Sequence, residues 1–133
     1  SIRAQIINLF EELQKRFNLT YLFISHDMSV VRHISTRVAV MYLGKIVEIA
    51  ETDVLFENSL HPYTEALLEA IPDVSSDKKG RRKLLEGDVP SPLSPPSGCS
   101  FHPRCFRAKE KCAIDEPALI KKGANHFVAC HYA

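Results

Sequence analysis

The stretch T-Y-L-F-I-S-H-D-M-S-V-V-R, residues 20–32, decides the expected fold of this chain. Its apolar run, residues 21–24, lacks polar alternation, which is typical of a strand covered on both faces, as in parallel sheets. The run ends at Ser25-His26-Asp27, and a helical pattern with Val30, Val31 and Ile34 follows. Because Asp is a favoured N-cap residue, Asp27 is placed to begin that helix.

Apolar residues recur at helical spacing before this stretch, which predicts an amphipathic helix over residues 2–17, closed at Asn18. A helix followed by a buried strand indicates an α/β fold. Further along, residues 37–42 and 45–49 are two β-rich runs joined by Leu43-Gly44, which predicts a hairpin with Gly44 at a positive φ. The second run alternates in polarity, as an outer strand would.

Two short helices are expected after the hairpin. Asp53 is placed to cap a turn over residues 54–57, and Pro62 suits the first turn of a helix over about residues 63–70, stopped by Pro72.

The chain then changes character. Residues 73–83 are polar and contain a basic cluster, for which a solvated linker is favoured over an RNA or lipid site: Lys78, Lys79, Arg81, Arg82 and Lys83. Residues 88–98 contain four prolines, which predicts an extended segment.

Composition excludes several classes of partner. The chain of 133 residues has seventeen Lys and Arg against sixteen Asp and Glu, so no bulk charge favours nucleic acid. The longest apolar run, residues 38–43, is far shorter than the roughly 20 residues that a membrane-spanning helix needs. The start has neither a Met nor a signal-peptide pattern, and we expect this chain to be part of a longer protein.

The four cysteines lie together in the last 35 residues and form a candidate metal site: Cys99, Cys105, Cys112 and Cys130. They make no C-x-x-C pair, so the usual zinc patterns are not matched, whereas loosely spaced thiolates suit a [4Fe-4S] cluster. Zinc, two disulfides and buried free thiols are the alternatives. His102, His126 or His131 could replace one ligand.

The Ser25-His26-Asp27 string does not predict a hydrolase. Neighbours on an extended chain point to opposite sides, so three consecutive residues cannot form a Ser-His-Asp relay. A histidine at the carboxyl end of a buried parallel strand can instead donate to a phosphate oxygen during phosphoryl transfer. A histidine satisfied by backbone groups in a turn is the alternative.

Several strings together resemble one family: L-T-Y-L-F-I-S-H-D-M-S-V-V-R-H-I, V-A-V-M-Y-L-G-K-I-V-E, H-P-Y-T-E-A-L-L-E-A-I-P and G-C-S-F-H-P-R-C. They are similar to the C-terminal part of the ATPase subunits of bacterial and archaeal oligopeptide and dipeptide ABC importers. This resemblance implies an α/β fold, namely a partial ABC-type nucleotide-binding domain with an irregular cysteine-containing C-terminal extension.

The resemblance also implies roles for individual residues. His26 falls on the switch histidine of the H-loop, which contacts the γ-phosphate of ATP, so it is both the catalytic and the nucleotide-binding candidate. Residues 60–72 resemble the extension typical of peptide importers. Cys99, Cys105, Cys112 and Cys130 fall on cysteines that bind a [4Fe-4S] cluster in some members.

The chain departs from the family in one respect. Its five glycines cannot be written as a phosphate-binding G-x-x-x-x-G-K-[ST] loop, and the signature motif and the Walker B carboxylates are also missing. We therefore expect this chain to need further residues for binding ATP and Mg and for hydrolysis. A non-catalytic metal-binding assembly or sensor module is the alternative function.

The resemblance implies three regions: residues 1–59 as part of the nucleotide-binding domain, 60–87 as the importer-type helix and linker, and 88–133 as the cysteine-containing extension. The implied partners are transmembrane permease subunits and a second ATPase subunit, which would hold the protein on the cytoplasmic face of the cell membrane. Because the strand at residues 21–24 lacks neighbours, we also expect a homodimer.

Overall fold

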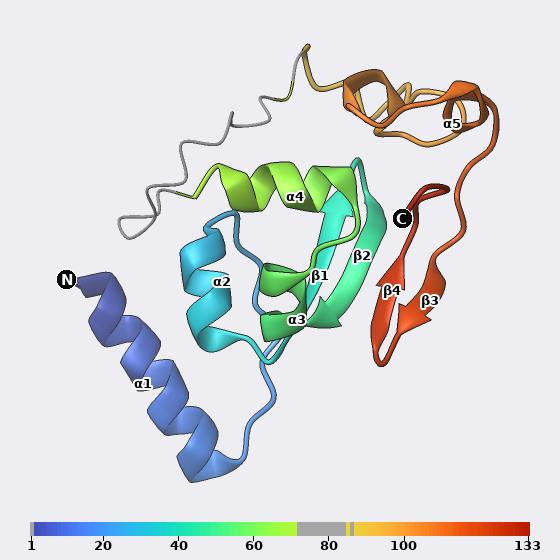
Figure 1. Cartoon of the computed structure of the whole chain (residues 1–133). Helices are drawn as coiled ribbons and strands as arrows, with labels where there is room; N and C mark the ends of the chain where they lie inside the picture. The colour runs from blue at the N-terminus through green and yellow to red at the C-terminus, as the bar shows by residue number, and fades with distance from the viewer. Residues whose placement is uncertain (1, 72–84, 86) are drawn as a thin grey trace, which may run out of the picture.

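The computed structural model describes residues 2–71, 85 and 87–133, and combines helices with one antiparallel sheet (Figure 1). The helices are α1 (Ile2–Phe17), α2 (Met28–Ile34), α3 (Thr52–Glu57), α4 (Pro62–Glu69), a 3-10 turn (His102–Arg104) and α5 (Glu110–Ile114). The strands are β1 (Arg37–Tyr42), β2 (Lys45–Glu51), β3 (Ile120–Gly123) and β4 (His126–Val128), in the sheet order β1-β2-β4-β3. The expected mixture of helices and strands is confirmed.

Figure 1 shows α2, α3 and α4 gathered around the β1–β2 hairpin, while α1 lies to one side. The 3-10 turn and α5 belong to a compact group of loops near the start of α4. The expected linker at residues 73–83 and the stop at Pro72 lie outside the described residues. Within the described residues, no helix is long and apolar enough to span a membrane.

The hairpin forms as its sequence predicts. Tyr42 pairs with Lys45, and the two linking residues both have positive φ, 46° at Leu43 and 77° at Gly44. Two positive φ values in a two-residue loop match the twist of the flanking strands. Leu43 takes a conformation that is unusual for its type.

The predicted strand at residues 21–24 is wrong in this structure. These residues are in an irregular connection between α1 and α2, and the side chains of Leu22 and Ile24 are 92% and 90% exposed. A run without polar alternation becomes a buried strand only where other strands flank it and layers cover it. The described residues supply neither for this run, because the sheet here is antiparallel and begins at β1.

Helix α1 has the predicted bounds but buries none of its residues. Its contacts with the rest of the chain include a ring contact between Phe10 and Tyr21, with centroids 5.6 Å apart, and two ion pairs. Its apolar side chains at Ile2, Ile6 and Leu9 are largely exposed.

Strand β2 is an inner strand, so the expectation of an outer strand is wrong. It pairs with β1 on one side and with β4 on the other. A bulge places two β2 residues, Val47 and Glu48, on the same buried side, because Val40 pairs with Glu48 and the next residue, Met41, pairs with Ile46. The polar residue that suggested a solvent-facing strand is therefore buried.

The C-terminal part of the chain is less irregular than expected, because β3 and β4 extend the sheet. Glu48 pairs with Val128 and Ile49 with Phe127, and Ala129 N donates to Val47 O at 2.8 Å. Val128 is completely buried. The C-terminal residues thus complete the sheet that the hairpin begins.

Two of the three predicted helix starts, those of α2 and α4, are confirmed. The Asp27 carboxylate accepts from Ser29 N and Val30 N at the start of α2, and Pro62 lies in the first turn of α4. The expected cap at Asp53 is wrong, since α3 begins at Thr52 and Asp53 lies in its first turn. Thr52 instead donates through its hydroxyl to Ser35 O at 2.6 Å.

The buried Glu48 carboxylate joins three segments. Oε1 accepts from Leu60 N at 2.7 Å, and Oε2 accepts from His61 N at 3.0 Å. The imidazole of His126 on β4 lies with Nε2 2.7 Å from Oε1; a carboxylate oxygen accepts, so Nε2 donates. With no exposed surface, this carboxylate depends entirely on these donors.

We predict that Glu48→Gln lowers the free energy of unfolding by about 3 kcal/mol, because one amide group cannot accept from all three donors. Urea unfolding at neutral pH measures this. Glu57→Gln, at an exposed position of α3, is the matched control and should change stability by less than about 0.5 kcal/mol. A Glu48→Gln variant as stable as the control would contradict the role given to this carboxylate.

Candidate functional site

His26 lies on the loop that leads into α2, and its side chain is exposed. Two hydrogen bonds of Asp27 stabilise this loop. Asp27 N donates to Ser25 Oγ at 3.0 Å, and Asp27 Oδ1 accepts from Ser29 N at 3.1 Å. Asp27 Oδ2 pairs with Arg3 on α1 at 2.7 Å. Because the Asp27 carboxylate caps α2 and binds Arg3, it is not placed to orient His26 as in a catalytic triad.

A groove of about 280 Å³ lies beside this loop. One wall comes from α1, and the other from Asp27 and α2; the lining residues are Arg3, Ala4, Ile7, Asn8, Asp27, Ser29, Val30 and His33. The His33 imidazole lies 3.5 Å from Glu11 on α1. The groove is therefore partly charged, and Asp27 is the residue of the Ser25-His26-Asp27 loop that lines it.

The four cysteine side chains are free, and the fold brings them near one another. Cys99 N donates to Cys112 O at 2.8 Å, and this hydrogen bond joins the backbone at Cys99 to α5. Cys105 follows the 3-10 turn, and Cys130 follows β4. Cys112 is buried and the other three are partly buried.

The thiols influence one another electrostatically. Burial raises the pKa of Cys99, of Cys130, and of Cys105 to about 11, and nearby cysteines raise each of these pKa values further. Four negative thiolates this close are therefore unfavourable unless a cation balances them.

Backbone N–H groups partly offset this effect at three of the four sulfurs. Arg107 N donates to Cys105 Sγ and Tyr132 N donates to Cys130 Sγ, each at 3.4 Å, and the backbone of Phe101 lowers the pKa of Cys99 in the same way. Each donor lies two residues after its cysteine. Hydrogen bonds to sulfur favour the thiolate, which is the form that binds metals.

The donor set suits a soft metal in its chemistry, since thiolates select zinc, copper(I) and iron–sulfur clusters. Within residues 2–71, 85 and 87–133, however, no group of three or more His, Cys, Asp or Glu side chains is arranged to hold a metal ion. The thiols are thus near enough to influence one another's pKa values, although they do not form such a group in this structure.

The three histidines considered as further ligands make other contacts. His102 Nδ1 donates to Cys99 O, and His131 Nε2 donates to Asp115 O, both at 2.9 Å. His126 binds Glu48 on the buried side of the sheet. These contacts give each histidine a structural role.

Sequence reasoning did not single out His61, which is 1% exposed at the N-cap of α4. Its Nδ1 accepts from Tyr63 N at 3.1 Å, so the neutral ring carries its proton on Nε2. Burial lowers the pKa of His61 to about 4; Glu48 opposes this shift, and Arg107 adds to it. Its position before Pro62 is the sequence signal that could have revealed it.

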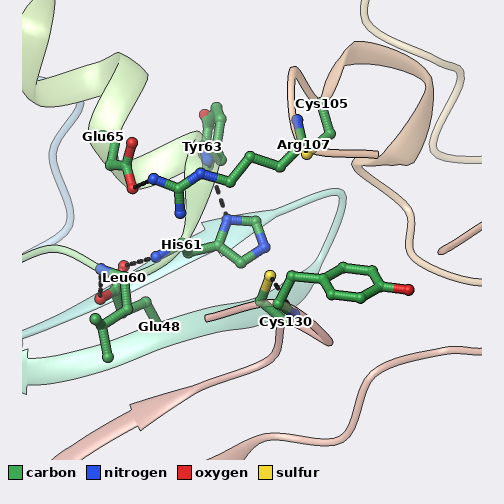
Figure 2. A network of polar contacts seen from close by, with 9 residues as sticks. Glu48, Leu60, His61, Tyr63, Glu65, Cys105, Arg107 and Cys130 are labelled. Carbon is green, nitrogen blue, oxygen red and sulfur yellow. Dashed lines mark hydrogen bonds and ion pairs between the residues drawn. The ribbon is translucent and has the colours of Figure 1, made fainter. Parts of the chain in front are cut away.

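Arg107 was also missed. Its guanidinium Nη2 donates to Glu65 Oε1 on α4 at 2.6 Å, so it links the cysteine loops to that helix (Figure 2). No local pattern predicts this contact, because 42 residues separate the partners.

Comparison with known proteins shows that the chain is similar to part of several transport proteins. Residues 47–112 match the family described as "Oligopeptide/dipeptide transporter, C-terminal region". The chain is 56% identical over 133 residues to the oligopeptide transport ATP-binding protein AppF of Bacillus subtilis, covering 98% of this chain and 40% of that protein. It is 47% identical over 132 residues to the dipeptide transport ATP-binding protein DppF of Haemophilus influenzae, covering 99% of this chain and 40% of that protein. The chain thus spans about 40% of the length of these relatives.

The buried, neutral His61 predicts a pH dependence of stability. Between about pH 6.5 and about pH 4 the unfolded chain binds a proton at this residue and the folded chain does not, so stability falls as the pH falls through this window. The loss contributed by His61 is about 3 kcal/mol, since one pKa unit corresponds to about 1.4 kcal/mol.

The measurement is urea unfolding at a series of pH values, compared with His61→Asn, which keeps an N-cap acceptor. The variant should lose less stability between pH 7 and pH 4 than the original chain. Parallel curves for the two proteins would show that His61 does not titrate in this window.

Proposed function

We propose that this chain works as part of an ATPase that drives peptide import, because it is similar to the C-terminal region of oligopeptide and dipeptide transport ATP-binding proteins. The observation that carries this proposal is that the His26 side chain is exposed. It lies on a loop that ends at Asp27, the N-cap residue of α2. In the proposed role, an imidazole N–H of His26 donates to the γ-phosphate of ATP and stabilises the charge that develops during transfer.

The remaining parts of this function belong to the longer protein. ATP and Mg would be bound mainly by residues outside this chain, because the chain has no G-x-x-x-x-G-K-[ST] loop. The proposed partners are permease subunits and a second ATPase subunit, which would keep the protein on the cytoplasmic face of the membrane. Two copies of this chain by itself would pair through the exposed apolar run at residues 21–24.

We propose a separate role for each of three consecutive regions of the chain. Residues 1–59 would belong to the nucleotide-binding domain, 60–87 would form the helix and linker of peptide importers, and 88–133 would carry the cysteine site. The contacts of β4 with β2 support close cooperation between the first and last of these regions.

We expect His26→Ala, made in the longer ATP-binding subunit, to lower the turnover of ATP by about 100-fold or more and to leave ATP affinity nearly unchanged. Steady-state hydrolysis and nucleotide titration separate the two effects. His33→Ala, a second exposed histidine seven residues along, is the matched control and should keep normal turnover. Normal turnover in the His26→Ala subunit would remove this residue from the mechanism.

We propose, as a second function, that the four cysteines hold an iron–sulfur cluster, with zinc as the alternative. Support comes from the N–H groups that face Cys99, Cys105 and Cys130, together with the mutual effect of the thiols on their pKa values. Positive side chains assist: Arg107 and Lys122 both lower the pKa of Cys130. Such a cluster or ion would supply the positive charge that the thiolates need, and would join four loops.

Loading should be measurable on protein prepared without oxygen. With ferrous iron and sulfide we expect visible absorption, which Cys105→Ser should reduce strongly and His102→Gln, in the same loop, should leave in place. Because the thiols must lose protons, loading should become stronger as the pH rises from 6 to about 8. A colourless protein that also binds no zinc would contradict this second function.

A further inference from the structure

An ion pair joins helix α1 to the loop that carries His26. Arg3 Nη1, in the first turn of α1, donates to Asp27 Oδ2 at 2.7 Å, and Asp27 is the residue after His26. Because α1 buries none of its residues, surface contacts of this kind hold it to the rest of the described chain. Arg3 therefore connects α1 to the residue that follows His26.

The two oxygens of the Asp27 carboxylate bind different helices. Oδ1 accepts from Ser29 N at 3.1 Å and from Val30 N at 3.3 Å, which fixes the carboxylate relative to α2. Oδ2 accepts from Arg3, which fixes the carboxylate relative to α1. The side chain of Asp27 is thus held between the two helices.

Asp27 also holds the backbone on both sides of His26. Asp27 N donates to Ser25 Oγ at 3.0 Å, so the residues before and after His26 are bonded to each other. The backbone of His26 lies between them, while its side chain is exposed. A change in the position of the Asp27 carboxylate therefore moves the Cα from which the imidazole extends.

We propose that Arg3 is a positioning residue for His26. By holding the Asp27 carboxylate, Arg3 keeps the loop in the conformation from which the His26 imidazole reaches the phosphate that is transferred. This inference rests on the function proposed above, in which His26 donates to the γ-phosphate of ATP. Arg3 itself is assigned no contact with the nucleotide, because its guanidinium is used by Asp27.

The exposure of the ion pair limits the size of the effect. The Arg3 side chain is 72% exposed and the Asp27 side chain is 33% exposed, and a pair in contact with water restrains its partners only weakly. Loss of Arg3 should leave α2 capped, because the cap uses the other carboxylate oxygen. Since catalysis is sensitive to small displacements of a reacting group, we expect a several-fold loss of turnover.

A second contact between α1 and α2 allows positioning to be separated from simple attachment of α1. Glu11 Oε1 lies 3.5 Å from His33 Nε2, about two turns further along α1 than Arg3, and neither residue belongs to the loop of His26. If Arg3 only attached α1 to the rest of the chain, loss of the Glu11 carboxylate would have the same effect as loss of Arg3.

The test measures steady-state ATP hydrolysis and ATP affinity in the longer ATP-binding subunit, in the presence of Mg. Arg3→Gln should lower kcat about fivefold, while the Kd for ATP changes less than about twofold. Arg3→Lys keeps a positive charge within reach of the carboxylate and should restore most of the turnover. Lys15→Gln, the matched control, makes a similar charge change at an exposed position of α1 and should keep normal turnover, as should Glu11→Gln.

A double-mutant cycle tests whether Arg3 acts through Asp27. Asp27→Asn keeps a side-chain oxygen that can cap α2, since Asn is a favoured N-cap residue, but it removes the charge that Arg3 binds. The variant that combines Arg3→Gln with Asp27→Asn should have the kcat of Asp27→Asn alone, because the ion pair is already broken.

Each other outcome overturns a definite statement. If His26→Ala lowers turnover as expected but Arg3→Gln behaves like Lys15→Gln, positioning is overturned and the role of His26 stands. Normal turnover in His26→Ala would overturn the proposed function, and positioning with it. An equal loss in Glu11→Gln, or a raised Kd with normal kcat in Arg3→Gln, would also overturn positioning. Additive losses in the double variant would show that Arg3 does not act through Asp27.

Discussion

The buried carboxylate of Glu48 is the interaction on which the rest of this structure depends. It accepts hydrogen bonds from the backbone at the start of α4 and from His126 on β4, so one side chain joins the hairpin, a helix and the last strand. Its position depends on the bulge at Val47, which turns Glu48 inward. Because a buried charge is unfavourable without donors, β2, β4 and the start of α4 must be formed together.

A series of contacts leads from this carboxylate to the cysteines. Glu48 fixes the backbone of His61, His61 caps α4, and the cap sets the position of Tyr63. Phe101 packs between Tyr63 and Tyr42, and it lies two residues after Cys99. The thiols are therefore positioned by the interior of the sheet, although their loops are largely irregular.

The sequence predicted the helix bounds, turns and helix starts that depend only on residues close together in the chain. The bounds of α1, the loop at Leu43-Gly44, the Asp27 cap of α2 and the place of Pro62 in the first turn of α4 were all predicted, because each depends on residues within one turn or one loop. The strand at residues 21–24 was wrong because burial depends on neighbouring strands. The inward turn of Glu48 was missed because a single bulged residue reverses the side to which alternation assigns it.

The candidate thiol site was visible in the sequence as a cluster of cysteines, but its surroundings were not, since Arg107 and Phe101 act across tens of residues. Those surroundings discriminate between functions. A thiol that senses oxidants reacts as a thiolate and needs a lowered pKa, whereas burial raises the pKa of Cys99, Cys105 and Cys130. The N–H groups at these sulfurs favour thiolates that a cation has already balanced. These three thiols are therefore poorly suited to reacting with peroxide.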